Sequence, residues 1–204
     1  QKHAVGPLGP WIYETTRWYR GPEETVRLRR PADGSVVWEA TVPHEPYGPP
    51  ILDGDTIYVG TLGHGVMALD AATGAVRWTI DDGWLGTAAG GLVAIRLIDS
   101  DSRILGADGR EAVFLSGAWV QLHGDTAYVG GCRRANLWRP EQACAEPEGT
   151  SAFDLATGVE RWRHPRPAGV LAADATRVYF LEGESDQAST LVVVAAATGA
   201  VRAG

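Results

Sequence analysis

The sequence predicts an all-β protein, a β-propeller of about five four-stranded antiparallel blades. A string that contains Thr-Gly or Asp-Gly recurs about every 40 residues, which is the length of a propeller blade. A second string, typical of a β-strand, recurs upstream of the best copies. No segment shows the sustained 3.6-residue periodicity of an amphipathic helix. A β-sandwich is the competing architecture, but it does not explain a repeated Gly-to-Trp spacing.

The first repeated string ends in a tryptophan in its best copies. Residues 68–78 read ALDAATGAVRW, and residues 152–162 read AFDLATGVERW. Weaker copies lie at 31–38, 106–114 and 195–203. In each copy the Thr-Gly or Asp-Gly pair lies between apolar runs, where a hairpin needs residues that accept positive φ. The string therefore predicts two strands joined by a turn.

The second string reads DGDTIYVG at 53–60, HGDTAYVG at 123–130 and DATRVYFL at 174–181. Each begins with turn residues and continues with β-branched and aromatic residues, which favour strands. Together the two strings predict one blade in full. Its strands are expected at 49–52, 56–61, 66–70 and 75–80, with turns at 53–55 and 71–74.

The spacing of the repeats divides the chain into five blades within one domain, residues 1–204. The blades are expected at about 1–42, 43–80, 81–116, 117–163 and 164–204. Five blades can close a ring alone, or they can form part of a larger propeller. Both arrangements remain open on the sequence.

The pattern Ala-x-Asp-x-x-Thr-Gly-x-x-x-Trp resembles the tryptophan-docking motif of the pyrroloquinoline-quinone-like (PQQ-like) propeller family. One copy comprises Ala68, Asp70, Thr73, Gly74 and Trp78, and the other comprises Ala152, Asp154, Thr157, Gly158 and Trp162. The resemblance implies that Trp38, Trp78 and Trp162 stack between neighbouring blades. In the third and fifth blades Phe114 and Ala203 are interpreted as replacing the tryptophan.

No cofactor, metal or catalytic residue is predicted. The dehydrogenases of this family stack their quinone on a disulfide between adjacent cysteines, and the sequence has no Cys-Cys pair and a single asparagine. The five histidines have no metal-ligand spacing. Nucleophile-elbow, P-loop and dinucleotide-binding patterns are absent. An enzymatic activity is therefore uncertain and the less favoured interpretation.

The two cysteines, Cys132 and Cys144, flank an insertion at 131–150. Their spacing does not fit a zinc motif, so a disulfide within one loop is predicted, with two free thiols as the alternative. A disulfide implies an oxidising, extracytoplasmic compartment. The net charge of −7 argues against nucleic acid or an anionic membrane as a partner, and no apolar run approaches the ~20 residues of a membrane span.

Binding residues are expected on one end of the propeller. The connections between successive blades and those between the two middle strands of each blade share an end, and here they are long and rich in aromatic and Arg residues, as binding surfaces are. The predicted binding residues are His44, Tyr47, His64, Trp84, Arg133, Arg134, Trp138 and His164. Solvated loops without a ligand remain the alternative.

These observations favour a non-enzymatic propeller that binds a protein or a small-molecule ligand, as a bacterial extracytoplasmic sensor or scaffold domain. The resemblance supports this hypothesis, because short PQQ-like propellers often serve as scaffolds or sensing domains. The alternative is an enzyme of bacterial secondary metabolism that uses the mouth of the propeller as a substrate pocket. A fold does not dictate a function, so both hypotheses stand at this stage.

Overall fold

The fold is all-β, as the sequence predicts. The computed structural model describes residues 2–17, 24–62, 65–97, 101–116, 118–130, 137–138, 149–165, 169–182 and 190–201. Within these ranges there are five antiparallel sheets and no helix. No helix in the described part of the chain is therefore long and apolar enough to cross a membrane.

Each sheet forms one blade, numbered here in chain order. Blade 1 contains β1 (Lys2–Leu8), β2 (Trp11–Arg17), β3 (Glu24–Arg29) and β4 (Val36–Val42). Blade 2 contains β5 (Ile51–Asp53), β6 (Thr56–Thr61), β7 (Gly65–Asp70) and β8 (Val76–Ile80). Blade 3 contains β9 (Trp84–Ala89), β10 (Leu92–Arg96), β11 (Ser102–Gly106) and β12 (Glu111–Leu115). Blade 4 contains β13 (Trp119–His123), β14 (Thr126–Gly130), β15 (Thr150–Asp154) and β16 (Glu160–His164). Blade 5 contains β17 (Gly169–Ala173), β18 (Arg177–Glu182) and β19 (Thr190–Ala195), and Val201 forms a single bridge to Val194.

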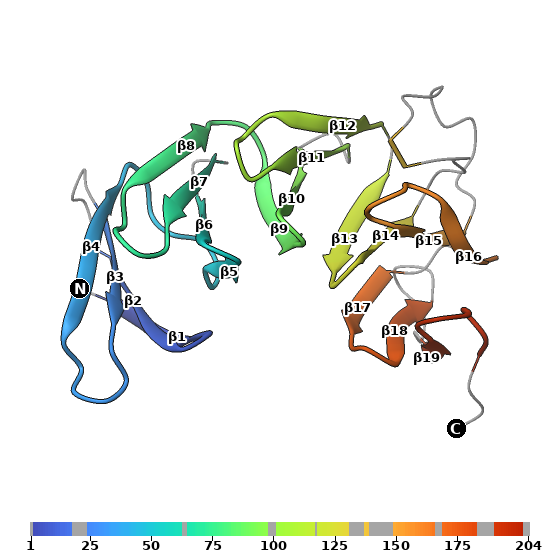
Figure 1. Cartoon of the computed structure of the whole chain (residues 1–204), viewed down its shortest axis with the longest axis horizontal. Coiled ribbons are helices and arrows are strands. Elements are labelled where there is room, and N and C mark those ends of the chain that lie inside the picture. The colour runs from blue at the N-terminus through green and yellow to red at the C-terminus, as the bar shows by residue number, and fades with distance from the viewer. Residues whose placement is uncertain are drawn as a thin grey trace.

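The blades lie side by side in an arc that does not close (Figure 1). The first strand of each blade lies on the inner side of the arc, and the last strand lies on the outer side. Blades 1 and 5 are the two ends, and no described sheet lies between them on the open side. The arrangement is that of a partial propeller.

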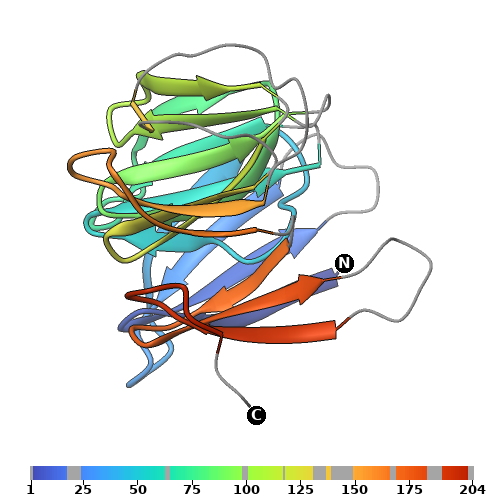
Figure 2. The same cartoon turned by 90° about the vertical axis from the view of Figure 1, so that its right-hand side faces the viewer.

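The two ends of the blades differ. The end that carries the hairpin turns, here called the turn end, includes the tight turns 54–55, 71–75, 90–91, 124–125 and 155–159, which lie on the left in Figure 2. The opposite end, here called the loop end, includes the connections 43–50 and 81–83 and the ends of β6 and β10. The meander topology alone separates the two sets of connections in this way.

Apolar residues pack between neighbouring blades because successive side chains in a strand point to opposite faces. In the centre of the arc both faces of a sheet are covered, and every residue of β6 is buried. Val26 and Leu28 of blade 1 pack with Ile57 and Val59 of blade 2. Equivalent clusters fill the other three junctions. The protein therefore has a core divided among its blade junctions.

The outer faces of the two end blades have different chemistry. On blade 1, Arg27 and Arg29 alternate with the buried residues of β3 and form ion pairs with Glu14, at 3.6 and 2.6 Å. Arg27 also pairs with Glu39. On blade 5, the corresponding face carries Arg177 and Tyr179, with Val193 opposite Tyr179. The outer face of blade 1 is thus dominated by paired charges, whereas that of blade 5 combines an arginine with aromatic and aliphatic side chains.

Candidate binding surface

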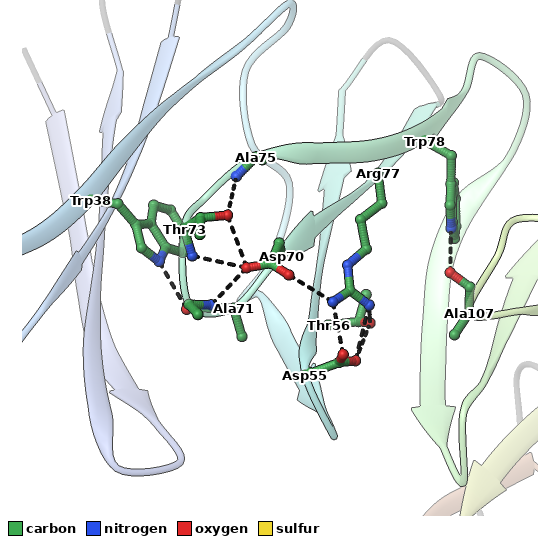
Figure 3. A network of polar contacts seen from close by, with 11 residues as sticks. Trp38, Asp55, Thr56, Asp70, Ala71, Thr73, Ala75, Arg77, Trp78 and Ala107 are labelled. Carbon is green, nitrogen blue, oxygen red and sulfur yellow. Dashed lines mark hydrogen bonds and ion pairs between the residues drawn. The ribbon is translucent and has the colours of Figure 1, made fainter.

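The aspartate and threonine of the repeated string fix the turn between β7 and β8 (Figure 3). Asp70 Oδ1 accepts hydrogen bonds from the backbone N–H of Ala72 and Thr73 and from the Thr73 hydroxyl, at 3.1, 2.9 and 2.9 Å. Such Asx turns replace backbone hydrogen bonds that the chain lacks in a tight turn. The motif residues therefore have a local structural role.

Arg77 joins this turn to the neighbouring one at the turn end. Its guanidinium donates to both carboxylate oxygens of Asp55, at 2.9 and 2.8 Å, and to Asp70 Oδ2 at 2.7 Å (Figure 3). A two-pronged pair of this kind is geometrically specific. The hydrogen bond from Arg77, followed by that from Thr73, lowers the pKa of Asp70 to about 2. The bond to Arg77 also lowers the pKa of Asp55.

Blade 4 repeats this network. Arg161 donates to Asp125 Oδ2 at 2.8 Å and to Asp154 Oδ2 at 2.6 Å. The hydrogen bond from Arg161, with that from Thr126, lowers the pKa of Asp125 to about 2, and Arg161 also holds the pKa of Asp154 far below its usual range. The sequence analysis assigned no role to these arginines. Their shared position, one residue before the tryptophan in both strings, was the available signal.

Three tryptophans contact the following blade at its turn. The indole N–H groups of Trp38, Trp78 and Trp162 donate to the carbonyls of Ala71, Ala107 and Ala196, at 2.9, 2.8 and 2.6 Å. The three tryptophans occupy equivalent positions in the outer strands of their blades, where they pair with Leu28, Ala68 and Ala152 respectively.

A turn glycine lies under each of these rings. A Cβ on Gly74 would come within 2.7 Å of Trp38, and one on Gly109 within 2.8 Å of Trp78. Both glycines also have positive φ. The turn therefore requires glycine for two independent reasons, backbone conformation and the close approach of the indole.

The third blade departs from the sequence interpretation. Strand pairing places Val113 opposite Ile104, the register of the tryptophans, whereas Phe114 lies opposite Arg103 and is 39% exposed. Phe114 therefore does not replace the tryptophan. The junction of blades 3 and 4 instead contains Leu137, which is fully buried and donates its backbone N–H to the Gly158 carbonyl at 2.8 Å.

At the loop end, the connection 43–50 is held against the end of β6. Tyr47 donates its N–H to the Gly60 carbonyl at 2.8 Å, and Leu62 donates to the Glu45 carbonyl at 2.8 Å. The backbone is thus fixed on both sides of Pro46, which forms a β-bridge with Thr61. The Tyr47 side chain nevertheless remains 56% exposed. A fixed backbone that exposes an aromatic side chain is favourable for binding, because little order is lost on association.

Tyr47 and Trp84, both predicted binding residues, line one hollow of about 520 Å³. The other lining residues are Leu85, Gly86, Arg96 and Leu97. Trp84 is the first residue of β9 and lies directly opposite Arg96 of β10. The size lies within the range of ligand pockets.

A second hollow of about 360 Å³ adjoins the first, since Gly86 and Arg96 line both. It lies between blades 3 and 4, and its remaining walls are Thr87, Ser102, Trp119, Val120 and Gln121. Arg96, Trp119 and Gln121 were not among the binding residues predicted from the sequence. Arg96 ends the strand LVAIR and Trp119 begins the strand WVQLH, so both could have been placed at the loop end from the strand order alone.

The other described binding candidates are not brought to these hollows. His44 is exposed in the connection 43–50. His164 is buried and stacks on Phe180 with ring centroids 5.3 Å apart, because its side chain points into the junction with blade 5. Trp138 was expected at the loop end, but it packs against the core of blades 3 and 4 beside Leu137, whose bond to Gly158 places this part of the insertion at the turn end.

The remaining sequence predictions lie outside the described residues. They concern His64, Arg133, Arg134, Cys132, Cys144 and Ala203. In the described part of the chain no group of three or more His, Cys, Asp or Glu residues could hold a metal ion. A third hollow of about 460 Å³ lies at the turn end between blades 4 and 5, but the Asp125 and Arg161 side chains in its wall are already paired with each other.

A sequence comparison identifies the family. The sequence profile of the family described as outer membrane protein assembly factor BamB matches residues 22–143, more than half of the chain. The chain belongs to this family. The PQQ-like resemblance of its repeats is thereby confirmed. A search of curated protein sequences found no match.

Solved structures agree with the fold of a BamB-type propeller. The chain is similar to BamB from Moraxella catarrhalis, with 14% identity, a TM-score of 0.58 and coverage of 97% of this chain and 62% of that one. A europium-containing methanol dehydrogenase gives 11% identity and a TM-score of 0.58, over 95% and 49% of the two chains. The C-terminal WD40 domain of Sif2 gives 9% identity and a TM-score of 0.59, over 96% and 58%. These likenesses show the fold alone, and the chain spans less than two thirds of each of these structures.

Proposed function

We propose that this BamB-type propeller is a non-enzymatic, extracytoplasmic scaffold that binds a protein partner with its loop end. The observation that carries the proposal is the pair of aromatic side chains, Tyr47 and Trp84, around one hollow of about 520 Å³. Aromatic residues and arginine are enriched at the centres of protein interfaces. Arg96 shares this hollow.

The turn end is less suited to a partner. Its carboxylates and arginines are engaged with one another, as in the pairs Arg77–Asp70 and Arg161–Asp154. Binding there would break hydrogen bonds that the blade already makes, whereas Tyr47 projects from a backbone that is fixed before the partner arrives. The family description, an assembly factor of outer membrane proteins, also supports a protein partner in an extracytoplasmic location.

Site-specific photo-crosslinking tests the binding surface. A benzophenone amino acid replaces Tyr47 in cells that produce the full-length protein, and crosslinked partners are identified by mass spectrometry. The matched control places the same amino acid at Val76, which is 52% exposed on the outer strand β8. The proposal expects a discrete crosslinked protein from position 47 and none from position 76. Crosslinks from position 76 with none from position 47 contradict it.

The extracytoplasmic location is tested through Cys132 and Cys144, which we propose to be disulfide-bonded. The native protein is alkylated with and without prior reduction, and the mass of each sample is measured. The proposal expects two added alkyl groups only after reduction. Two alkylated thiols in the non-reduced sample would remove the support for both the disulfide and an oxidising compartment.

A further inference from the structure

Arg96 differs from the arginines of the turn networks. Arg77 and Arg161 each bind two carboxylates. The exposed Arg96 side chain makes no hydrogen bond or ion pair with any of the described residues. A guanidinium presents five N–H donors in a planar fork that matches a carboxylate. The donors of Arg96 are therefore available to a ligand.

The side chains around Arg96 are mainly apolar in the first hollow, and both apolar and polar in the second. The first hollow contributes Tyr47, Trp84 and Leu97, and the second contributes Trp119 and the half-buried Gln121. Neither a hydrogen bond nor an ion pair joins the Gln121 side chain to another described residue. An amide of this kind can both donate to and accept from a peptide backbone.

The two hollows meet at Gly86. Gly86 and Thr87 together oppose Ala94, where the register between β9 and β10 shifts. A Cβ on Gly86 would lie 2.9 Å from the Ala94 carbonyl oxygen, so the bulge excludes a side chain at this position. The two hollows share Gly86 and Arg96, one on the side of blade 2 and the other on the side of blade 4, and together they are here called the groove. Bulges are over-represented beside active sites, where they redirect side chains.

We propose that this groove binds an extended peptide segment of the partner, whose carboxylate is held by Arg96 and whose flanking apolar side chains lie against Trp84 and Trp119. The proposal rests on the proposed function and names the chemistry that the partner presents. Charge complementarity selects a carboxylate, because Arg96 is the cation that both hollows share. An extended chain can contact both hollows, which lie on opposite sides of the start of β9, more readily than a compact ligand can.

Titration with short peptides tests this inference. The probes are an acetylated and amidated heptapeptide Gly-Ser-Leu-Glu-Tyr-Ser-Gly, its Gln counterpart, and the Gln counterpart with a free C-terminal carboxylate. Nitrogen-15 NMR of the intact protein follows the Arg96 Nε–H and Trp84 Nε1–H signals. The Glu peptide or the free-carboxylate peptide is expected to give saturable shifts at up to about 5 mM, and the amidated Gln peptide is not.

Three variants serve as matched controls. R96Q should weaken binding by about 10-fold or more, since hydrogen bonds to charged groups are the stronger class. R96K keeps the charge without the planar fork and should lose less. R110Q removes an arginine at the turn end whose side chain is 89% exposed, and it should leave binding unchanged.

The outcomes separate this inference from the proposed function. Equal shifts with the Glu and the amidated Gln peptides, no saturable shift with either carboxylate, or full binding by R96Q each overturn the inference. If Tyr47 crosslinks persist in the R96Q variant at wild-type yield, the scaffold function stands without a carboxylate contact. If the crosslinks fail and carboxylate peptides still bind through Arg96, the groove stands and the protein partner is wrong.

Discussion

Two neighbouring junctions of the arc are filled in different ways. Between blades 2 and 3, Trp78 of the repeated string packs on Gly109 and donates to the Ala107 carbonyl. Between blades 3 and 4, the corresponding register holds Val113, and the buried Leu137 comes from the insertion between β14 and β15. The repeat thus fixes the register at which a side chain must fill the junction between two blades. That side chain can also come from a segment outside the outer strand of the blade.

A second contact supports the junction that lacks a tryptophan. The Thr87 hydroxyl of β9 accepts a hydrogen bond from the backbone N–H of Leu122 in β13, at 2.6 Å. Thr87 lies in the bulge of β9, where an extra residue turns a side chain toward the neighbouring blade. Junctions in a repeat protein contribute to stability as nearest-neighbour terms, so the two junctions can be compared by substitution.

The largest effect is expected at the tryptophan junction. Replacing the half-buried Trp78 by Ala should lower the free energy of unfolding by about 3–5 kcal/mol, because both the packing of a large indole and its hydrogen bond are lost. The change removes the contact with the buried Tyr58, whose ring centroid lies 5.9 Å away, and the hydrogen bond to Ala107. Denaturant unfolding measures the loss, with V76A on the same strand as the control. A loss below about 1 kcal/mol would count against a docking role.

A smaller but still large effect is expected at the other junction. L137A should lower the free energy of unfolding by about 2–4 kcal/mol, because it leaves a cavity among buried residues. Leu62 is 44% exposed, and L62A is the matched control with a near-neutral expectation. Equal, small losses for both variants would show that the insertion does not stabilise this junction.

The arginine networks predict a dependence on acid. The pKa values of Asp70 and Asp125 lie near 2 in the folded protein, below the ordinary 3.8. The stabilisation is therefore complete above pH 3.8 and is lost as the pH falls toward 2. The double variant R77Q/R161Q should lower the thermal midpoint by a few degrees at pH 7 and show a shallower decline between pH 4 and 2. R110Q is the control, and an unchanged acid slope in the double variant would contradict this assignment.

The smallest effect is expected at Phe114. F114A should cost about 0.5 kcal/mol, since the ring is largely outside the core and its contact with Arg103, 6.0 Å from the guanidinium carbon to the ring centroid, is exposed. The same denaturation experiment measures it. A loss above about 2 kcal/mol would mean that Phe114, rather than Val113 with Leu137, fills the tryptophan position.

The fold was accessible from the sequence because its signals are local. The turn residues and alternating strands of 53–80 predict β6 at its observed bounds, Thr56–Thr61, and place β5, β7 and β8 within two residues. Phe114 was misassigned because the assignment relied on its aromatic side chain and not on the number of residues after the turn glycine. Gly74 precedes Trp78 by four residues, and the same count from Gly109 leads to Val113.

The candidate site was only partly accessible, since it depends on contacts between distant segments. Tyr47 and Trp84 could be placed at the loop end from the order of the strands. The burial of His164 depends on Phe180 in the next blade. The position of Trp138 depends on the path of a long insertion, which carries no periodicity to follow. Arg96 was overlooked because it closes an ordinary strand and forms no motif.

The charged outer face of blade 1 has a consequence for any sheet that packs against it. Glu14, Arg27 and Arg29 are already paired with one another on this face. A purely apolar sheet would remove water from these ion pairs without offering them new partners, which opposes association. A neighbour therefore has to bring polar groups of its own, so blade 1 selects its neighbour by electrostatic complementarity rather than by apolar area.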